Sequence, residues 1–192
     1  ISHHKVAGRR NWGRSDATLA QIERARRAGV DVTIDAYPYL AGSTMLRALL
    51  PPWANEGGVE ALLERLDDPH VRAQIARDYE TGLPHWQDLV RASGWDSIAV
   101  ASAPRNRHFE GRRIVELAGD SGVTPVEFVC DLLLAEDAGV TIVAHMMEEG
   151  DVRRILAFPE AMIGSDGIPL PGKPHPRWAG SFVRILGKYA RE

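Results

Sequence analysis

The feature that most constrains the fold is an alternation of short strand-like runs with helical patterns of about ten residues. Residues 30–37 alternate in polarity and are rich in β-branched side chains, which predicts a strand. Residues 140–144 and 161–164 predict two more, and residues 1–2 resemble the end of a fourth. Helical patterns separate these runs, at residues 15–28, 124–136 and 151–158. We therefore expect an α/β fold with a parallel sheet or barrel, of which four strands would form half.

The middle of the chain has a different character. Residues 51–111 are richer in charged and aromatic side chains, with short helical pieces and one probable strand at 97–101. We predict three segments: a barrel segment over 1–50, an inserted segment over 51–111, and a second barrel segment over 112–192. A last helix is expected over residues 181–191.

Composition excludes several classes of function. A net charge of −3 and the lack of any Lys/Arg block argue against nucleic-acid binding. No apolar run is as long as a membrane span, so no membrane partner is expected. The only cysteine, Cys130, cannot form an internal disulfide and suits a reducing compartment, so we expect a cytoplasmic location.

The start of the chain is unusual. It begins at Ile1 without a methionine, inside what resembles a strand end. From this we expect a fragment of a longer polypeptide.

Asp166 stands directly after the predicted strand at residues 161–164 and is followed by Gly167. A carboxylate at the carboxyl end of a barrel strand can bind a metal or transfer a proton. Asp-Gly is also a common turn pair, so a purely structural turn is the alternative for this residue.

Two adjacent histidines, His3 and His4, follow the first strand end, and Lys5 comes next. Neighbours in a strand point to opposite faces, so at most one of the two would face a site at the strand mouth. Imidazole is the commonest protein ligand for zinc, whereas a tag remnant or surface pair is the alternative. Lys5 could bind a substrate carboxylate or project into solvent.

Other polar side chains stand at or beyond predicted strand ends. Asp35 could serve a site or anchor a loop, and Tyr37 and Tyr39 could donate to a substrate oxygen or pack in a core. Arg177, on a loop restricted by prolines, has a planar fork that suits carboxylates. His145 is a possible supporting residue. Three histidines in the middle segment are expected to face solvent: His70, His85 and His108.

Taken in order, five motifs are together specific. They are Ile1-Ser2-His3-His4-Lys5, Asn11-Trp12-Gly13-Arg14, Asp35-Ala36-Tyr37-Pro38-Tyr39, Ile163-Gly164-Ser165-Asp166-Gly167 and His175-Pro176-Arg177. The set resembles the N-acyl-D-amino-acid deacylases (D-aminoacylases) of the amidohydrolase superfamily. The resemblance covers nearly the whole chain and is poorest near residues 51–106.

The resemblance implies a metal-dependent (β/α)8 TIM barrel, with this chain supplying strands five to eight and a small α+β lid. It implies that His3 is a zinc ligand and that Asp166 is both a metal ligand and the general base and acid. Lys5, Tyr37 and Arg177 would bind the free carboxylate of an N-acyl-D-amino acid. The expected cofactor is one or two Zn²⁺ ions, and the products are a D-amino acid and a carboxylate.

Some features depart from this pattern. The predicted strand at 30–39 contains no histidine, although superfamily members usually place a metal ligand at the end of strand six. The superfamily's His-x-His pair on strand one and the family's bridging cysteine would lie on strands that this chain does not contain. With these metal ligands missing, the chain alone is expected to be inactive, with exposed barrel edges that allow self-association. Two alternatives remain: a cyclic-amide or dipeptide hydrolase of the same superfamily, and a non-catalytic binding or assembly domain.

Overall fold

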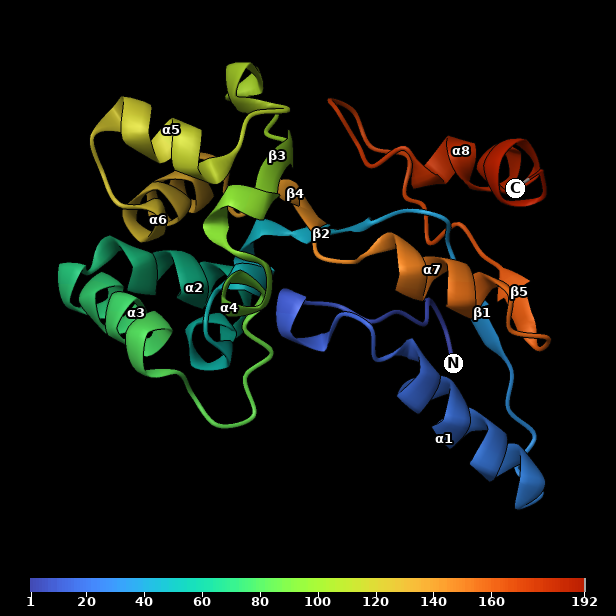
Figure 1. Cartoon of the computed structure of the whole chain (residues 1–192). Helices are drawn as coiled ribbons and strands as arrows, with labels where there is room; N and C mark the ends of the chain where they lie inside the picture. Colours follow the sequence, from blue (N-terminus) through green and yellow to red (C-terminus); the bar gives the residue numbers. More distant parts are fainter. Residues whose placement is uncertain (192) are drawn as a thin grey trace. The chain divides into compact units, whose positions relative to one another are not determined.

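The alternation of strands and helices is present in the computed structural model, which describes residues 1–191 (Figure 1). The chain forms two compact units. Unit 1 contains Ile1–Gly42, His145–Pro169 and the described residues from His175 onward, and unit 2 contains Ser43–Ala144 with Leu170–Pro174. Both units combine helices with short strands, so the predicted α/β class is confirmed.

Unit 1 is built on parallel strands. Strand β1 (Ile34–Ala36) pairs in parallel with β5 (Ala161–Ile163), with Ile34 opposite Ala161. Residues 1–4 lie along the other side of β1, where the Asp35 N–H donates to the Ile1 carbonyl (3.1 Å) and the His4 N–H donates to the Asp35 carbonyl (2.7 Å). The predicted parallel arrangement of these three segments is therefore present.

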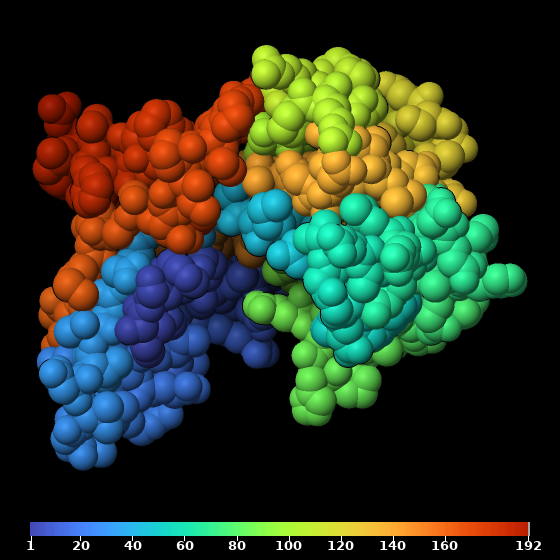
Figure 2. Space-filling model, turned by 180° about the vertical axis from the view of Figure 1, so that it is seen from behind, coloured from blue at the N-terminus to red at the C-terminus, as the bar shows by residue number. Residues whose placement is uncertain are grey.

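An apolar core holds this small sheet against its helices. Helix α1 (Ser15–Arg27) packs on α7 (Glu149–Leu156), and α7 packs on β5. The core side chains come from both ends of the chain: Val6, Leu19, Ile22, Ile34, Ala36, Ile155 and Phe158. Figure 2 shows the N-terminal atoms (blue) and the atoms of the last third of the chain (orange to red) adjoining each other. Burial of this apolar surface is the main stabilising contribution to unit 1.

A buried carboxylate joins the start of α1 to α7. Asp151 is 1% exposed and accepts the N–H groups of Gly13 (2.7 Å) and Ser15 (3.0 Å). These are N-terminal donors that a helix cannot satisfy by itself. Burial raises the pKa of Asp151, but the hydrogen bonds from Ser15 and Gly13, together with the Arg154 cation, outweigh it and hold that pKa below its usual range. The carboxylate thus caps α1 from another element.

We expect Asp151→Asn to lower the free energy of unfolding by about 1–3 kcal/mol, since its NH₂ group must face a backbone N–H that now has no acceptor. Urea unfolding followed by circular dichroism measures the change. Glu23→Gln, which alters only an exposed pair with Arg27, is the matched control. Equal stability of the two variants would contradict the capping role.

Unit 2 contains a second, three-stranded sheet with the order β2-β4-β3. Its helices include α6, whose N-terminus has a capping box in which Thr124 and Glu127 satisfy each other's backbone N–H groups. The strands are β2 (Ala41–Met45), β3 (Ile98–Ser102) and β4 (Thr141–His145). The helices are α2 (Gly58–Asp67), α3 (Pro69–Thr81), α4 (Leu89–Ser93), α5 (Ile114–Ser121) and α6 (Pro125–Ala135). Short 3₁₀ turns lie at Leu46–Leu49, Pro52–Asn55, Trp95–Ser97 and Arg107–Phe109.

The strand at residues 140–144 is present but is arranged differently from the prediction. We expected it in the parallel sheet, whereas β4 pairs antiparallel with β3, with Ile98 opposite Ala144. A buried strand has the same run of apolar side chains in either direction, so the sequence does not reveal its partner. The two compact units divide the chain near residues 42 and 145. The three segments expected from the sequence, 1–50, 51–111 and 112–192, stay a prediction.

The C-terminal region of unit 1 also differs from the prediction. Helix α8 (Arg177–Arg184) starts four residues before the expected position of 181, and a π-helical turn (Ile185–Tyr189) follows it. A 3₁₀ turn at Arg9–Asn11 completes the elements of this unit. Several apolar side chains of α8 and the turn after it are exposed: Trp178, Phe182, Val183 and Leu186. Within residues 1–191, no helix has both the length and the apolar character needed to cross a membrane.

Candidate active site

Asp166 lies just beyond β5, in a tight segment between two glycines. Its φ of 47° is in the left-handed region, which non-glycine residues adopt rarely and often at functional sites. A Cβ on Gly164 would lie 2.9 Å from Asp35 Oδ1, and one on Gly167 would collide with the backbone of Trp178. The two glycines therefore allow the segment to pass close to its neighbours and present the Asp166 carboxylate.

The two adjacent histidines have different surroundings, although residues 2–3 form a turn rather than the extended strand on which the prediction of opposite faces rested. His4 Nε2 lies 3.1 Å from the Thr18 hydroxyl of α1, and burial lowers its pKa. His3 is exposed and has a φ of 41°. Its ring Nδ1 lies 2.9 Å from Lys5 Nζ, and Lys5 also donates to the His3 carbonyl at 2.6 Å. His3 therefore contacts the Lys5 amine directly, whereas His4 lines a small pocket with Lys5 and Tyr37 and contacts α1 through its ring.

Tyr37 is the centre around which the candidate residues gather. Lys5 Nζ lies 5.4 Å from the centroid of its ring, and Arg177 Cζ lies 4.7 Å from the same centroid. Both distances are within the range of cation–π attraction. The phenol oxygen is buried, Arg177 acts on it as a donor, and among the described residues its O–H group has no acceptor. Two cations and an unsatisfied hydroxyl at one place form a site suited to an anion.

Arg177 links this cluster to Asp166. Its Nη1 lies 2.8 Å from Asp166 Oδ2, while the arginine side chain is only 5% exposed. Buried arginine requires such a partner, because an unpaired buried charge is strongly destabilising. The five residues predicted for the site, His3, Lys5, Tyr37, Asp166 and Arg177, thus meet through an unbroken series of contacts within unit 1.

The ionisation of the cluster reflects burial first and the neighbouring charges second. Burial lowers the pKa of Lys5, Arg177 lowers it further, and Asp166 and Asp35 oppose the change. Burial raises the pKa of Tyr37 to about 12, so the phenol stays protonated at neutral pH as a hydrogen-bond donor. A bound carboxylate would stabilise the charged form of Lys5 and accept from Tyr37.

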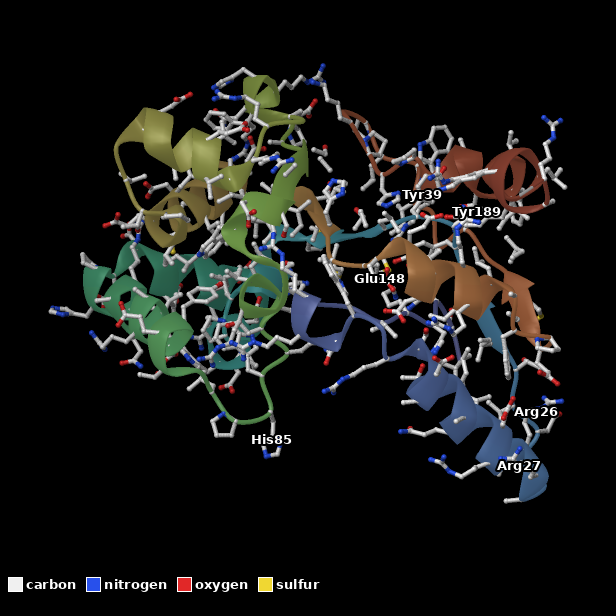
Figure 3. The ribbon with its side chains drawn as sticks, in the orientation of Figure 1. Arg26, Arg27, Tyr39, His85, Glu148 and Tyr189 are labelled. Atoms are coloured by element: carbon white, nitrogen blue, oxygen red, sulfur yellow. The ribbon has the colours of Figure 1, made fainter. Side chains whose placement is uncertain are left out.

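The weaker candidates have mainly structural contacts. Asp35 Oδ1 accepts the His3 N–H at 2.7 Å, which makes it an anchor for the histidine backbone. Tyr39, labelled in Figure 3, packs beneath α8 with its ring 5.0 Å from Arg184 Cζ. His145 is exposed at the end of β4. In unit 2, His85 projects from a loop (Figure 3), and it is exposed like His70 and His108, as expected.

The donor types fit part of a zinc site. An imidazole such as that of His3 and a carboxylate such as that of Asp166 are both ordinary zinc ligands, which number four in a typical protein site. Among residues 1–191, however, no three His, Cys, Asp or Glu side chains cluster closely enough to hold a metal ion. This chain therefore supplies at most a fraction of a complete ligand set.

The sequence analysis did not single out His175 as a separate participant. It lies two residues before Arg177, is 4% exposed, and contacts both Tyr37 and Tyr39 edge-on. A histidine between two prolines was the available signal, but it was interpreted only as part of a rigid loop.

Comparison with known proteins gives three curated relatives over the full chain. A D-aminoacylase from Alcaligenes xylosoxydans xylosoxydans is 38% identical over 192 residues, and an N-acyl-D-glutamate deacylase of the same organism is 35% identical over 195. Both alignments cover 100% of this chain but only 30% of the relative. No family model matches the sequence.

Solved structures give the same result. An N-acyl-D-glutamate deacylase from Bordetella bronchiseptica, complexed with zinc and a phosphonate inhibitor, superposes with a TM-score of 0.68 at 31% identity. A D-aminoacylase with a binuclear metal centre superposes with a TM-score of 0.67 at 36% identity. Each match covers 100% of this chain and about 30% of the other.

The fold is thus that of a segment found in amidohydrolases, the class to which a matching D-aminoacylase structure is assigned. Within that class, the chain is homologous over its whole length to the N-acyl-D-amino-acid deacylases, so the resemblance seen in its motifs is confirmed. It spans about 30% of the length of these relatives.

Proposed function

We propose that this chain forms part of the catalytic barrel of a zinc-dependent amidohydrolase that converts N-acyl-D-amino acids to D-amino acids and carboxylates. The observation that carries the proposal is the convergence of Lys5 and Arg177 on Tyr37, beside Asp166. An anion site next to a strand-end carboxylate matches a substrate with a free α-carboxylate and a nearby amide. A neutral cyclic amide would leave both cations unused, so the linear substrate is favoured.

The finer architecture belongs to the same proposal. The parallel segments of unit 1 would be barrel strands, within the set numbered five to eight, and residues 51–111 would form the lid insertion. One or two Zn²⁺ ions would be held by His3 and Asp166 together with ligands from polypeptide outside this chain. The zinc complex of the Bordetella relative and the binuclear centre of the D-aminoacylase support this assignment.

The residues of this chain then have separate roles in the reaction. Zinc, when bound, would lower the pKa of a coordinated water and polarise the amide carbonyl. Asp166 takes the proton of the water that attacks the amide carbon, and returns it to the amine nitrogen as the C–N bond breaks. Lys5, Tyr37 and Arg177 hold the α-carboxylate. Binding there selects the configuration at the α-carbon for which the amide carbonyl faces the attacking water.

We also propose a cytoplasmic location, because the single cysteine, Cys130, cannot form a disulfide within this chain and so suits a reducing compartment. Self-association through exposed strand edges remains a prediction. Residues 1–4 and β5 each pair with β1 on one side only within the described part of the chain.

Metal removal tests the proposal. We expect a chelator to reduce hydrolysis of N-acetyl-D-methionine by the complete enzyme at least about 100-fold, because the attacking water loses its activation, and added zinc should restore the rate. The released D-amino acid measures the rate, and N-acetyl-L-methionine is the control substrate. The isolated chain should show negligible turnover with or without zinc. Hydrolysis that persists in the presence of the chelator, or equal rates with the D- and L-enantiomers of the substrate, would argue against the assignment.

A further inference from the structure

His175 uses both ring nitrogens in one fixed arrangement. Its Nε2 lies 2.8 Å from the Ala41 carbonyl oxygen, and its Nδ1 accepts the backbone N–H of Arg177 at 3.0 Å. A carbonyl oxygen can only accept, so Nε2 carries the proton, and Nδ1 must be unprotonated to receive the Arg177 N–H. The hydrogen bonds therefore select the neutral Nε2–H tautomer.

The surroundings maintain that neutral form. Burial lowers the pKa of His175 to about 4, Arg177 and His145 act in the same direction, and the Ala41 carbonyl and Asp166 oppose them. Protonation would place an N–H on Nδ1 against the N–H of Arg177 and break that bond. At neutral pH the ring is thus a stable acceptor.

This acceptor lies at the start of α8. Arg177 is the first residue of the helix, and its N–H is one of the donors that a helix leaves unsatisfied at its N-terminus. His175 fills that role from two residues upstream, and the other side of its ring is tied to Ala41 at the start of β2. The position of the Arg177 backbone is therefore fixed relative to Ala41.

The same ring also supports the phenols. Its centroid lies 6.3 Å from that of Tyr37 and 5.0 Å from that of Tyr39, with interplanar angles of 66° and 87°. Such edge-on packing is a favourable arrangement for aromatic rings. Tyr37 and Arg177, two of the three proposed carboxylate-binding residues, are thus both held by one buried imidazole.

We propose that His175 is the positioning residue of the carboxylate site: as the neutral Nε2–H tautomer, it sets the Arg177 fork and the Tyr37 phenol for a substrate α-carboxylate. The proposal rests on the proposed function, because it assigns the ring a role in binding that substrate. It predicts that the two ring nitrogens contribute separately, since one faces Arg177 and the other faces Ala41.

Two isosteric variants of the complete enzyme separate these contributions. In His175→Asn the side-chain oxygen can replace Nδ1 as acceptor, whereas in His175→Gln the amide nitrogen can replace Nε2 as donor. We expect the Gln variant to raise KM for N-acetyl-D-methionine about tenfold while kcat stays within about twofold, and the Asn variant to stay within about threefold of wild type in KM. For N-acetyl-D-methioninamide, which lacks the carboxylate, the two variants should not differ.

Each other result has a definite meaning. Equal losses with the acid and the amide, or equal behaviour of the Asn and Gln variants, would show a merely structural role and overturn the proposal. Wild-type enzyme that hydrolyses neither compound would overturn the proposed function first, which is a separate result. If the variants do not fold, ¹⁵N NMR of the wild-type ring decides: an Nε2–H tautomer with free Nδ1 is expected, and an Nδ1–H tautomer refutes the proposal.

Discussion

Replacing Asp166 by asparagine in the complete enzyme is expected to reduce kcat for N-acetyl-D-methionine about 10³-fold while leaving zinc bound. The amide has the shape of the carboxylate and can still accept from Arg177, but it cannot take a proton from the attacking water. General base and acid catalysis typically contributes factors of about 10²–10⁴. Steady-state kinetics gives the rate, and metal analysis of the purified variant gives the zinc content.

Asp31→Asn is the matched control, because Asp31 is an exposed carboxylate in the same unit, just before β1. It should retain wild-type kcat. Substantial turnover by the Asp166 variant would remove this residue from the chemistry and leave it a turn residue. Loss of zinc together with activity would instead indicate that its main contribution is as a metal ligand.

Replacing Arg177 by lysine is expected to lower kcat/KM for the N-acyl-D-amino acid about 100-fold. The substitution keeps a cation near Asp166 but removes the planar fork that can bind a carboxylate through two parallel hydrogen bonds. Each hydrogen bond to a charged group contributes about 1.5–3 kcal/mol, and about 1.4 kcal/mol corresponds to a factor of ten. The loss should fall on acids and spare the matching carboxamides.

The comparison of acid with carboxamide is the informative measurement here. Arg27→Lys, at an exposed arginine at the end of α1 (Figure 3), should leave kcat/KM unchanged for both the acid and the carboxamide. A uniform loss with both substrates would mean that Arg177 acts only through its ion pair with Asp166. An unchanged acid rate would exclude the carboxylate-binding role altogether.

Much of the candidate site could be predicted because the sequence pattern shows where the strands end. The apolar run before Asp166 and the alternating residues before Tyr37 both mark strands, and parallel strands bring their carboxyl ends to one edge. That rule places Lys5, Tyr37 and Asp166 near one another, whereas Arg177 comes from the start of α8, and the roles of all four residues stay predictions. The convergence on the Tyr37 ring and the Arg177–Asp166 ion pair needed coordinates, because both depend on side-chain packing between segments far apart in the chain.

The fold was less predictable where contacts with distant segments, rather than the local sequence pattern, decide the structure. Helix α5 was missed because its Gly119-Asp120-Ser121 end resembles a loop, and β2 was missed because Ala41-Gly42-Ser43 has low strand propensity. Their hydrogen-bonded neighbours impose the conformation. The direction of β4 was wrong for the same reason, as its antiparallel partner β3 lies about forty residues earlier.

The discontinuity of unit 1 has a consequence for synthesis. Strand β1 is made early, but β5 follows only after almost all of unit 2 has been added. A ribosome extending the chain from its N-terminus therefore releases a nearly contiguous unit 2 first, while Ile34, Ala36 and the segment around Lys5 await their partners. Closing such a long loop is slow compared with local folding. The cluster around Tyr37 is thus expected to form only after the residues of unit 2 have been synthesised.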